Sequence, residues 1–137
     1  MLRVLPLVVL VSVAGCTNDD FEPPGRTAVV VAEESRVAAL IERHESGVWE
    51  DRSGRCAVRI LGIEADSTFA WAQCSYPPLG DVPAGAMSTA YRIDGQSIRS
   101  PRDGSYSEDI EALFPAAVAE AIAKDSQLFL AEPWPIP

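Results

Sequence analysis

Two cysteines in neighbouring strand-like segments are the strongest constraint on how this chain folds. The segments run from Arg55 to Ile63 and from Thr68 to Ser75, and both are rich in β-branched, aromatic and apolar residues. Pairing them antiparallel around Ala65 places Cys56 opposite Cys74. Directly opposed residues have Cβ atoms about 4.5 to 5.5 Å apart, and the closest of these pairs approach the separation that a disulfide needs. We therefore predict a hairpin closed by a Cys56–Cys74 disulfide, with two buried free thiols as the alternative.

The same register assigns the other side chains of this hairpin to its two faces. On the face without the cysteines, Leu61 would lie opposite Phe69 and Arg59 opposite Trp71. We expect four apolar residues of this face to be core: Leu61, Ile63, Phe69 and Trp71. Arg59 over Trp71 would form a cation–π pair, or else a platform for a ligand. The cysteine face is apolar too, so we expect both faces to be at least partly covered.

A helix before this hairpin and a second hairpin after it are also predicted. From Ala28 to His44, apolar residues recur at steps of three and four, and His44 falls on the apolar face. The second hairpin would join strands over 88–93 and 96–100 through Asp94-Gly95, a strong turn signal. Between the hairpins, the stretch from Tyr76 to Gly85 contains three prolines and two glycines and is predicted to be a loop.

The C-terminal part of the chain is predicted to be helical from Ser105 to Leu113, with Ser105 and Glu108 as a capping box. Pro115 would either kink this helix or open a second one that runs to Lys124. The order helix, hairpin, hairpin, helix predicts an α+β domain, an antiparallel sheet of about four strands flanked by an N-terminal and a C-terminal helix. We expect this domain to span 28–127, followed by a Pro-rich tail over 128–137 that docks on the domain or stays free.

The first sixteen residues predict an exported, anchored protein. Arg3 is followed by an apolar run to Gly15, which is the order of a secretory signal and too short for a membrane span of about 20 residues. The end of the run, Val13-Ala14-Gly15-Cys16, resembles the bacterial lipobox. The resemblance implies cleavage after residue 15, a diacylglyceryl group on Cys16, and a linker over 16–27 between the membrane and the domain. The alternatives are an ordinary signal with a nearby free cysteine, or an uncleaved anchor.

This context agrees with the charge and with the cysteine count. The chain carries 11 Lys and Arg against 20 Asp and Glu, a net charge of −9, which argues against nucleic acid as a partner. Lipid on Cys16 leaves two cysteines, and in an oxidising compartment an even remainder predicts one disulfide. We expect the protein to reside in the bacterial cell envelope, where a lipid would anchor it on the extracytoplasmic side of the cell membrane or the outer membrane.

A weaker resemblance covers roughly half of the chain. The segment from Cys56 through Cys74 to YRIDGQSIRSPRDGSYSEDIEALFP is similar to uncharacterised small bacterial envelope domains. These share a strand with a late cysteine, an R-x-D-G hairpin, and a downstream P-x-D-G-S pattern before L-F-P. The resemblance supports the architecture and implies no activity.

Few residues suggest chemistry. His44 is the only histidine, which excludes multi-histidine metal sites, and on an apolar helix face a structural role is favoured over that of a general base. Alternate oxygen-bearing residues resemble the start of a calcium loop: Asp103, Ser105, Ser107 and Asp109. The pattern fails at its sixth and twelfth positions, where Glu108 and Phe114 stand, and a turn with a helix cap explains it without an ion. We therefore predict no catalytic residue, no metal and no cofactor.

Two hypotheses for function follow. The first is a non-catalytic tethered domain that has a structural role or binds another envelope protein through the Tyr76–Gly85 loop and the tail. The second is a small-ligand or enzymatic domain with a pocket between sheet and helices, lined by Trp71, Tyr91 and Phe114 with His44 at its mouth. From the two hypotheses together, we predict that a binding surface includes four aromatic residues: Trp71, Tyr76, Tyr91 and Trp134.

Overall fold

Four antiparallel strands form one sheet in which each strand lies beside the next one in the chain. They are β1 (Arg55–Glu64), β2 (Ser67–Tyr76), β3 (Gly85–Asp94) and β4 (Ser97–Arg99). The structure, a computed structural model, describes residues 21–125. Both predicted hairpins are present, and pairing of β2 with β3 along their whole length joins them into a single meander.

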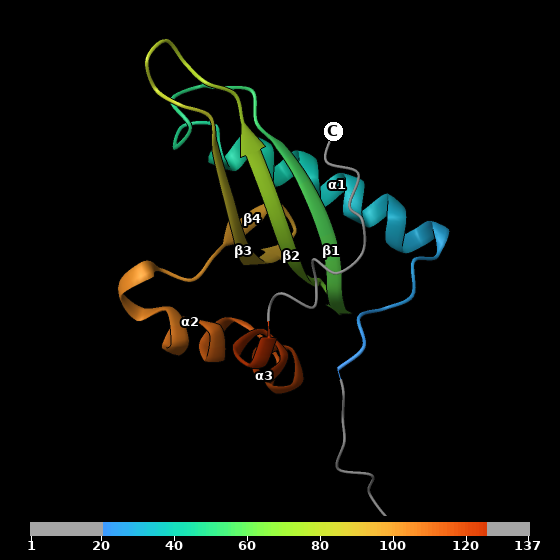
Figure 1. Cartoon of the computed structure of the whole chain (residues 1–137). Helices are drawn as coiled ribbons and strands as arrows, with labels where there is room; N and C mark the ends of the chain where they lie inside the picture. Colours follow the sequence, from blue (N-terminus) through green and yellow to red (C-terminus); the bar gives the residue numbers. More distant parts are fainter. Residues whose placement is uncertain (1–20, 126–137) are drawn as a thin grey trace, which may run out of the picture.

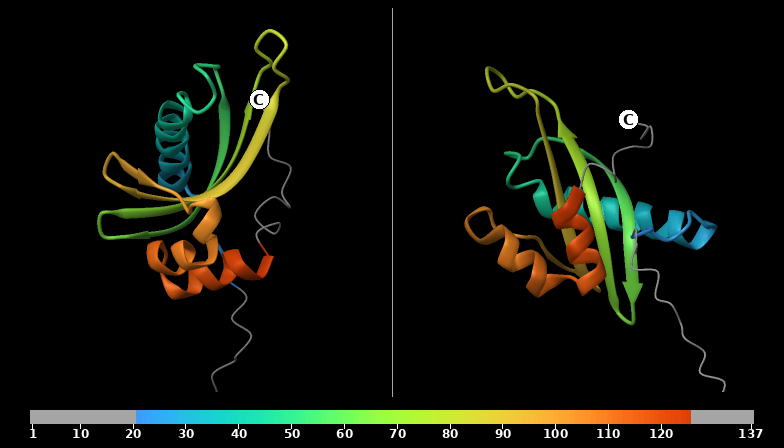
Figure 2. Two further views of the ribbon diagram at one scale, coloured as in Figure 1. Left: turned by 90° about the vertical axis from the view of Figure 1, so that its left-hand side faces the viewer. Right: turned by 60° about the horizontal axis from the view of Figure 1, so that its bottom comes forward.

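Helices cover both faces of this sheet, so the domain is α+β as predicted. They are α1 (Ala28–Glu45), the short 3₁₀ helix η1 (Asp103–Ser105), α2 (Tyr106–Leu113) and α3 (Ala116–Asp125). The long α1 lies on one side of the sheet, and α2 and α3 lie on the other (Figure 1; Figure 2, left). Within residues 21–125, no helix has the length and apolar character that crossing a membrane requires.

Local sequence explains where the helices begin and end. Thr27 caps α1, because its hydroxyl accepts a hydrogen bond from the N–H of Val30 at 3.3 Å. Pro115 separates α2 from α3, which confirms the second of the two predicted outcomes at this proline. Ser105 is the N-cap residue of α2, but its side chain makes no capping bond. Its hydroxyl donates instead to Asp109 at 3.1 Å, so the predicted capping box with Glu108 is not formed.

The register of the first hairpin agrees with the prediction up to a bulge. Cys56 pairs with Cys74, and a disulfide joins them. The register shifts by one residue between Ile60 and Gly62, so that Gly62, not Leu61, lies opposite Phe69. An extra residue in one strand reverses the faces of all residues beyond it. Ile63 therefore leaves the predicted core and is 48 % exposed.

The sheet has one apolar core on each face. Under α1, the core includes the disulfide, Trp49 and Tyr91 together with the buried side chains of α1. Under α2 and α3, Phe69 and Trp71 pack with residues of both helices. Leu61, Phe69 and Trp71 are buried, as predicted.

The buried stripe of α1 ends one residue later than predicted. Ile41 is fully buried, and the next buried position is Glu45, four residues on, while His44 is exposed. The prediction that His44 lies on the apolar face is therefore wrong. An α-helix has 3.6 residues per turn, so a position three or four residues after Ile41 can lie on the buried face. The sequence therefore allowed either His44 or Glu45 to be buried, and packing of α1 against the sheet buries Glu45.

Candidate binding surface

Two loops meet at one end of the domain and are held together by Arg52. One loop, residues 46–54, connects α1 to β1, and the other, residues 77–84, connects β2 to β3. The guanidinium of Arg52 donates to the backbone oxygens of Trp49 at 2.8 Å, Pro77 at 3.2 Å and Pro83 at 3.1 Å. Both ends of the second loop are therefore fixed to the first, and we call the two loops together the loop end of the domain.

Aromatic rings beneath Arg52 give this junction a packed base. The Arg52 guanidinium lies 4.4 Å from the ring centroid of Tyr76, and Tyr76 stacks on Trp49 with 5.5 Å between ring centroids. Each ring covers a glycine. A Cβ atom at Gly54 would overlap the Trp49 ring, and one at Gly85 would overlap the Tyr76 ring. The two glycines thus make room for the rings that support the loops.

The loop end exposes three large apolar side chains. Val48 is 72 % exposed, Leu79 is 47 % exposed and Val82 is 41 % exposed. Leu79 and Val82 exchange two backbone hydrogen bonds of 2.9 Å, which closes a tight turn with Gly80 in the left-handed region (φ 56°). A turn closed in this way presents its side chains on a rigid backbone, and exposed clustered apolar groups are typical of interaction sites.

The same two loops also carry three carboxylates. Glu50, Asp51 and Asp81 are exposed, and none of their side chains forms a hydrogen bond or an ion pair with another residue of 21–125. Glu50 and Asp51 both have left-handed backbone conformations, with φ of 56° and 61°. Such conformations are costly for residues with a Cβ and persist where the surrounding structure fixes them. The loop end thus carries exposed apolar side chains together with three exposed carboxylates.

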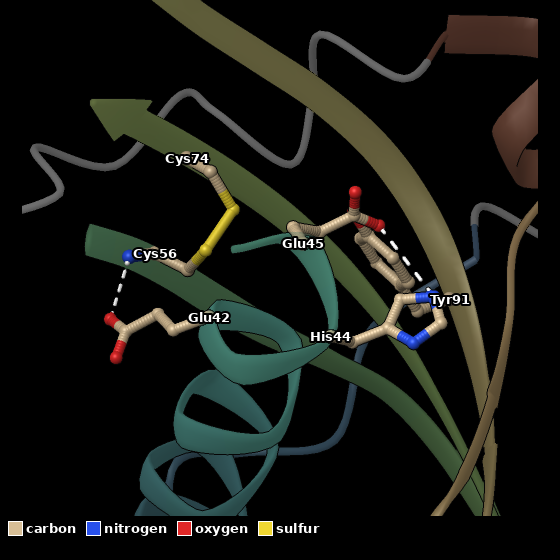
Figure 3. Close-up of a disulfide and its surroundings, with 6 residues drawn as sticks. All are labelled: Glu42, His44, Glu45, Cys56, Cys74 and Tyr91. Atoms are coloured by element: carbon tan, nitrogen blue, oxygen red, sulfur yellow. Dashed lines mark hydrogen bonds and ion pairs between the residues drawn. A yellow bond between two sulfur atoms is a disulfide. The ribbon is translucent and has the colours of Figure 1, made fainter. Parts of the chain in front are cut away.

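The disulfide lies outside the loop end, under the C-terminal turn of α1 (Figure 3). Glu42 accepts the backbone N–H of Cys56 at 2.9 Å, and buried Glu45 accepts the hydroxyl of Tyr91 at 3.2 Å. Burial, and then the charge of Glu45, raise the pKa of Tyr91 well above its usual range, so the phenol stays protonated and donates. Nε2 of His44 lies 3.9 Å from Oε1 of Glu45, and the His44 side chain is about half exposed. The hydrogen bonds of Glu42 and Glu45 thus bind α1 to the sheet.

The pocket of the second hypothesis is not formed by the residues that were predicted to line it. Tyr91 belongs to the core under α1, whereas Trp71 and Phe114 belong to the core under α2 and α3. Because the sheet separates these two cores, the three aromatic side chains do not converge on one cavity. His44, expected at the mouth of the pocket, is exposed on α1.

Of the predicted binding-surface residues that the structure describes, only Tyr76 lies at the loop end. Tyr76 is half-buried and supports the loop end. Trp71 is 4 % exposed and Tyr91 is fully buried, so neither is accessible to a partner, and the prediction for them is wrong. Trp134 and Cys16, the predicted lipid-acceptor residue, lie outside the described residues.

Trp49 and Arg52 were not predicted as part of any site. The available signal was a large aromatic residue in a polar loop between two glycines, with an arginine three residues later. A tryptophan in such a loop must pack against something, and its neighbours were not deducible without the fold.

Two residues of the calcium-like pattern, Ser105 and Asp109, make side-chain contacts within the chain. Asp109 accepts the backbone N–H of Arg102 at 2.8 Å and two guanidinium N–H groups of the same residue at 2.9 and 3.0 Å. These hydrogen bonds from Arg102 hold the pKa of Asp109 well below its usual range. The carboxylate thus fixes the turn that leads into α2.

Comparison of the chain with protein-family models, with curated protein sequences and with solved structures found no match to any of them.

Proposed function

We propose that this protein is a lipid-anchored domain of the bacterial envelope that binds another envelope protein through its loop end. The observation that carries this proposal is the position of the exposed apolar side chains. Residues 21–27, which follow the proposed anchor, lead into the N-terminus of α1, and the 77–84 loop projects from the opposite side of the domain (Figure 1; Figure 2).

The helix α1 provides this separation. It has 18 residues and a length of about 27 Å at 1.5 Å per residue, and the 46–54 loop begins at its C-terminus. A domain tethered before α1 would therefore hold the loop end away from its anchor. There, Val48, Leu79 and Val82 are accessible to a partner, with backbone positions fixed by Arg52 and by the Leu79–Val82 turn. Fixed positions lower the entropy cost of association.

The anchor is tested by the intact mass of protein extracted from membranes. The expected mass is that of a chain beginning at Cys16 with added acyl chains, because two or three acyl chains hold a protein on a bilayer stably. Cys16→Ser is the control and is expected to leave the protein unlipidated. An unlipidated mass for the unsubstituted protein would contradict the anchor.

Binding is tested in intact cells with a photo-crosslinking amino acid placed at Leu79. Glu120, exposed on α3 and away from the loop end, is the matched control position. A discrete crosslinked product is expected from position 79 and not from position 120, and Val82→Ser is expected to reduce it, because a polar side chain loses the apolar contact. Equal products from both positions, or none from either, would argue against a specific partner at the loop end.

A further inference from the structure

The outer edge of β3 has no partner strand among the described residues along Gly85–Tyr91, the part of the strand next to the loop end. β3 has ten residues, all of which pair with β2, whereas β4 has three and pairs only with Arg92, Ile93 and Asp94. The remaining stretch, Gly85–Tyr91, has no strand on its outer side within the described part of the chain (Figure 2, left). This edge was not anticipated by the sequence.

The hydrogen-bonding pattern identifies which residues direct their backbone groups outward. Asp94 and Ser97 flank a two-residue turn and so form a hydrogen-bonded pair. Such pairs alternate along antiparallel strands, so even-numbered residues of β3 direct their N–H and C=O toward the outer edge. The register of β3 with β2 has no bulge, so the alternation extends to Ser88 and Ala86.

The geometry of the disulfide leads independently to the same assignment of the outward-directed residues of β3. The Cα atoms of Cys56 and Cys74 are 4.0 Å apart. This is far below the separation of about 5.5 Å in a hydrogen-bonded pair and nearer the value of about 4.5 Å in a non-hydrogen-bonded pair. Cys74 therefore directs its backbone groups to its other neighbour, Met87 on β3. The residues on either side of Met87 must then direct theirs outward. Ala86 and Ser88 are both exposed, and their outward groups form no hydrogen bond with any described residue.

The other edge of the sheet is protected, which makes the open part of β3 distinctive. On β1, the outward N–H of Cys56 is bonded to Glu42, and Val58 and Ile60 are 7 % and 0 % exposed beneath α1. Natural edge strands are usually short, covered, bulged or charged, because an open edge is a template for another strand. The stretch Gly85–Tyr91 contains neither a charged residue nor a proline.

We infer that this edge takes up an extended, positively charged segment of a partner protein by β-strand addition, with hydrogen bonds to Ala86 and Ser88. We assign a positively charged occupant because the loop end carries three exposed carboxylates, Asp81 in the 77–84 loop and Glu50 and Asp51 in the 46–54 loop. None of them forms an ion pair with a residue in the described part of the chain. The open edge is short, because Pro83 precedes it and Ala90 is fully buried beyond it. This inference rests on the proposed function, since it names the contact made beside the loop end.

The test uses the full chain in detergent micelles with a short synthetic peptide of alternating lysine and valine as the probe. Addition of the peptide is expected to slow hydrogen exchange at the amides of Ala86 and Ser88. Ser88→Pro removes one outward N–H and leaves the bonds of β3 to β2, so binding is expected to weaken about tenfold. Ser88→Ala keeps the N–H and is expected to bind as the unsubstituted protein does.

Several outcomes would overturn the inference. They are unchanged exchange at Ala86 and Ser88 when the peptide binds, equal binding by Ser88→Pro, and equal binding of a peptide of alternating glutamate and valine. Protection of the same amides that rises with protein concentration, without peptide, would assign the edge to a second copy of this chain. If Ser88→Pro does not fold, judged by loss of protection at Met87, the exchange of the unsubstituted protein decides the question.

Failure of this inference is distinguishable from failure of the proposed function. A crosslink at Leu79 that Ser88→Pro leaves unchanged would retain the partner and reject strand addition. Peptide-dependent protection of Ala86 and Ser88 without any crosslink at Leu79 would support strand addition at this edge and argue against a partner at the loop end.

Discussion

The hydroxyl of Tyr91 on β3 donates a hydrogen bond to Oε1 of Glu45 on α1 across 3.2 Å, and both residues are buried. A buried carboxylate without a donor is costly, so this bond explains how a glutamate occupies the apolar face of α1. It also ties the end of α1, from which the 46–54 loop departs, to the middle of the sheet.

Tyr91→Phe is expected to lower the free energy of unfolding by about 1–3 kcal/mol, because it leaves the Glu45 carboxylate buried without this donor. The measurement is denaturant unfolding. Adding Glu45→Met to Tyr91→Phe is expected to recover part of the loss, since no charge then remains to be satisfied. Strictly additive costs in the double-mutant cycle would contradict a direct interaction between the two side chains.

Gly54→Ala is expected to destabilise the protein by about 1–3 kcal/mol, because a Cβ at this position overlaps the Trp49 ring. Gly47→Ala, in the same loop, is the matched control. No atom lies within 4 Å of a Cβ built there, and its effect should stay within about 0.5 kcal/mol. Thermal unfolding of both variants checks this, and equal stability of the two would show that Trp49 does not lie over Gly54.

Arg52→Ala is expected to release the 77–84 loop and to lower the free energy of unfolding by about 1–2 kcal/mol. The change removes the hydrogen bonds to Pro77 and Pro83 and the contact with Tyr76. Hydrogen exchange of the loop amides is the direct measurement. Arg52→Lys should restore little, because an ammonium group lacks the planar fork of donors. The control is Arg43→Ala on exposed α1 surface, and equally fast loop exchange in that variant would refute the role of Arg52.

Asp94 makes part of the free energy of unfolding depend on pH in the acid range. A hydrogen bond from Ser67, then those from Arg99 and Arg92, lower its pKa to about 2. An unfolded aspartate has a pKa of about 3.9, so the folded state favours the ionised form. The contribution is fully present above pH of about 4 and is lost as the pH falls toward 2.

Asp94→Asn is therefore expected to flatten the dependence of stability on pH in this window. The measurement is urea unfolding at a series of pH values. Asp66→Asn, in the exposed β1–β2 turn, is the control and should preserve the slope. A slope unchanged by Asp94→Asn would contradict the assignment.

Replacing both Cys56 and Cys74 by alanine is expected to cost about 3 kcal/mol, since the bridge closes a loop with a sequence separation of 18. The unsubstituted protein in reductant should approach the stability of the double variant. Alkylation of two thiols without prior reduction would show that the bridge is absent from the isolated protein.

The sequence by itself determined the local elements and the pairing of the first hairpin. The positions of Cys56 and Cys74 about a short polar link set the register, and Pro115 separated two helices. These features depend on residues close in the chain: turn chemistry, the missing N–H of proline, and the two-residue period of a strand. The α+β class followed from their order.

Only the tertiary structure decided which surfaces are buried and which meet solvent. The bulge before Gly62 moved Ile63 out of the core, and the register of β3 placed Trp71 and Tyr91 on opposite faces of the sheet. The loop end depends on contacts of Arg52 with residues 25 and 31 positions away in the chain. Periodicity gives each residue a face of its own element, but which faces meet is a property of the packed whole, because burial is shared among segments that are distant in sequence.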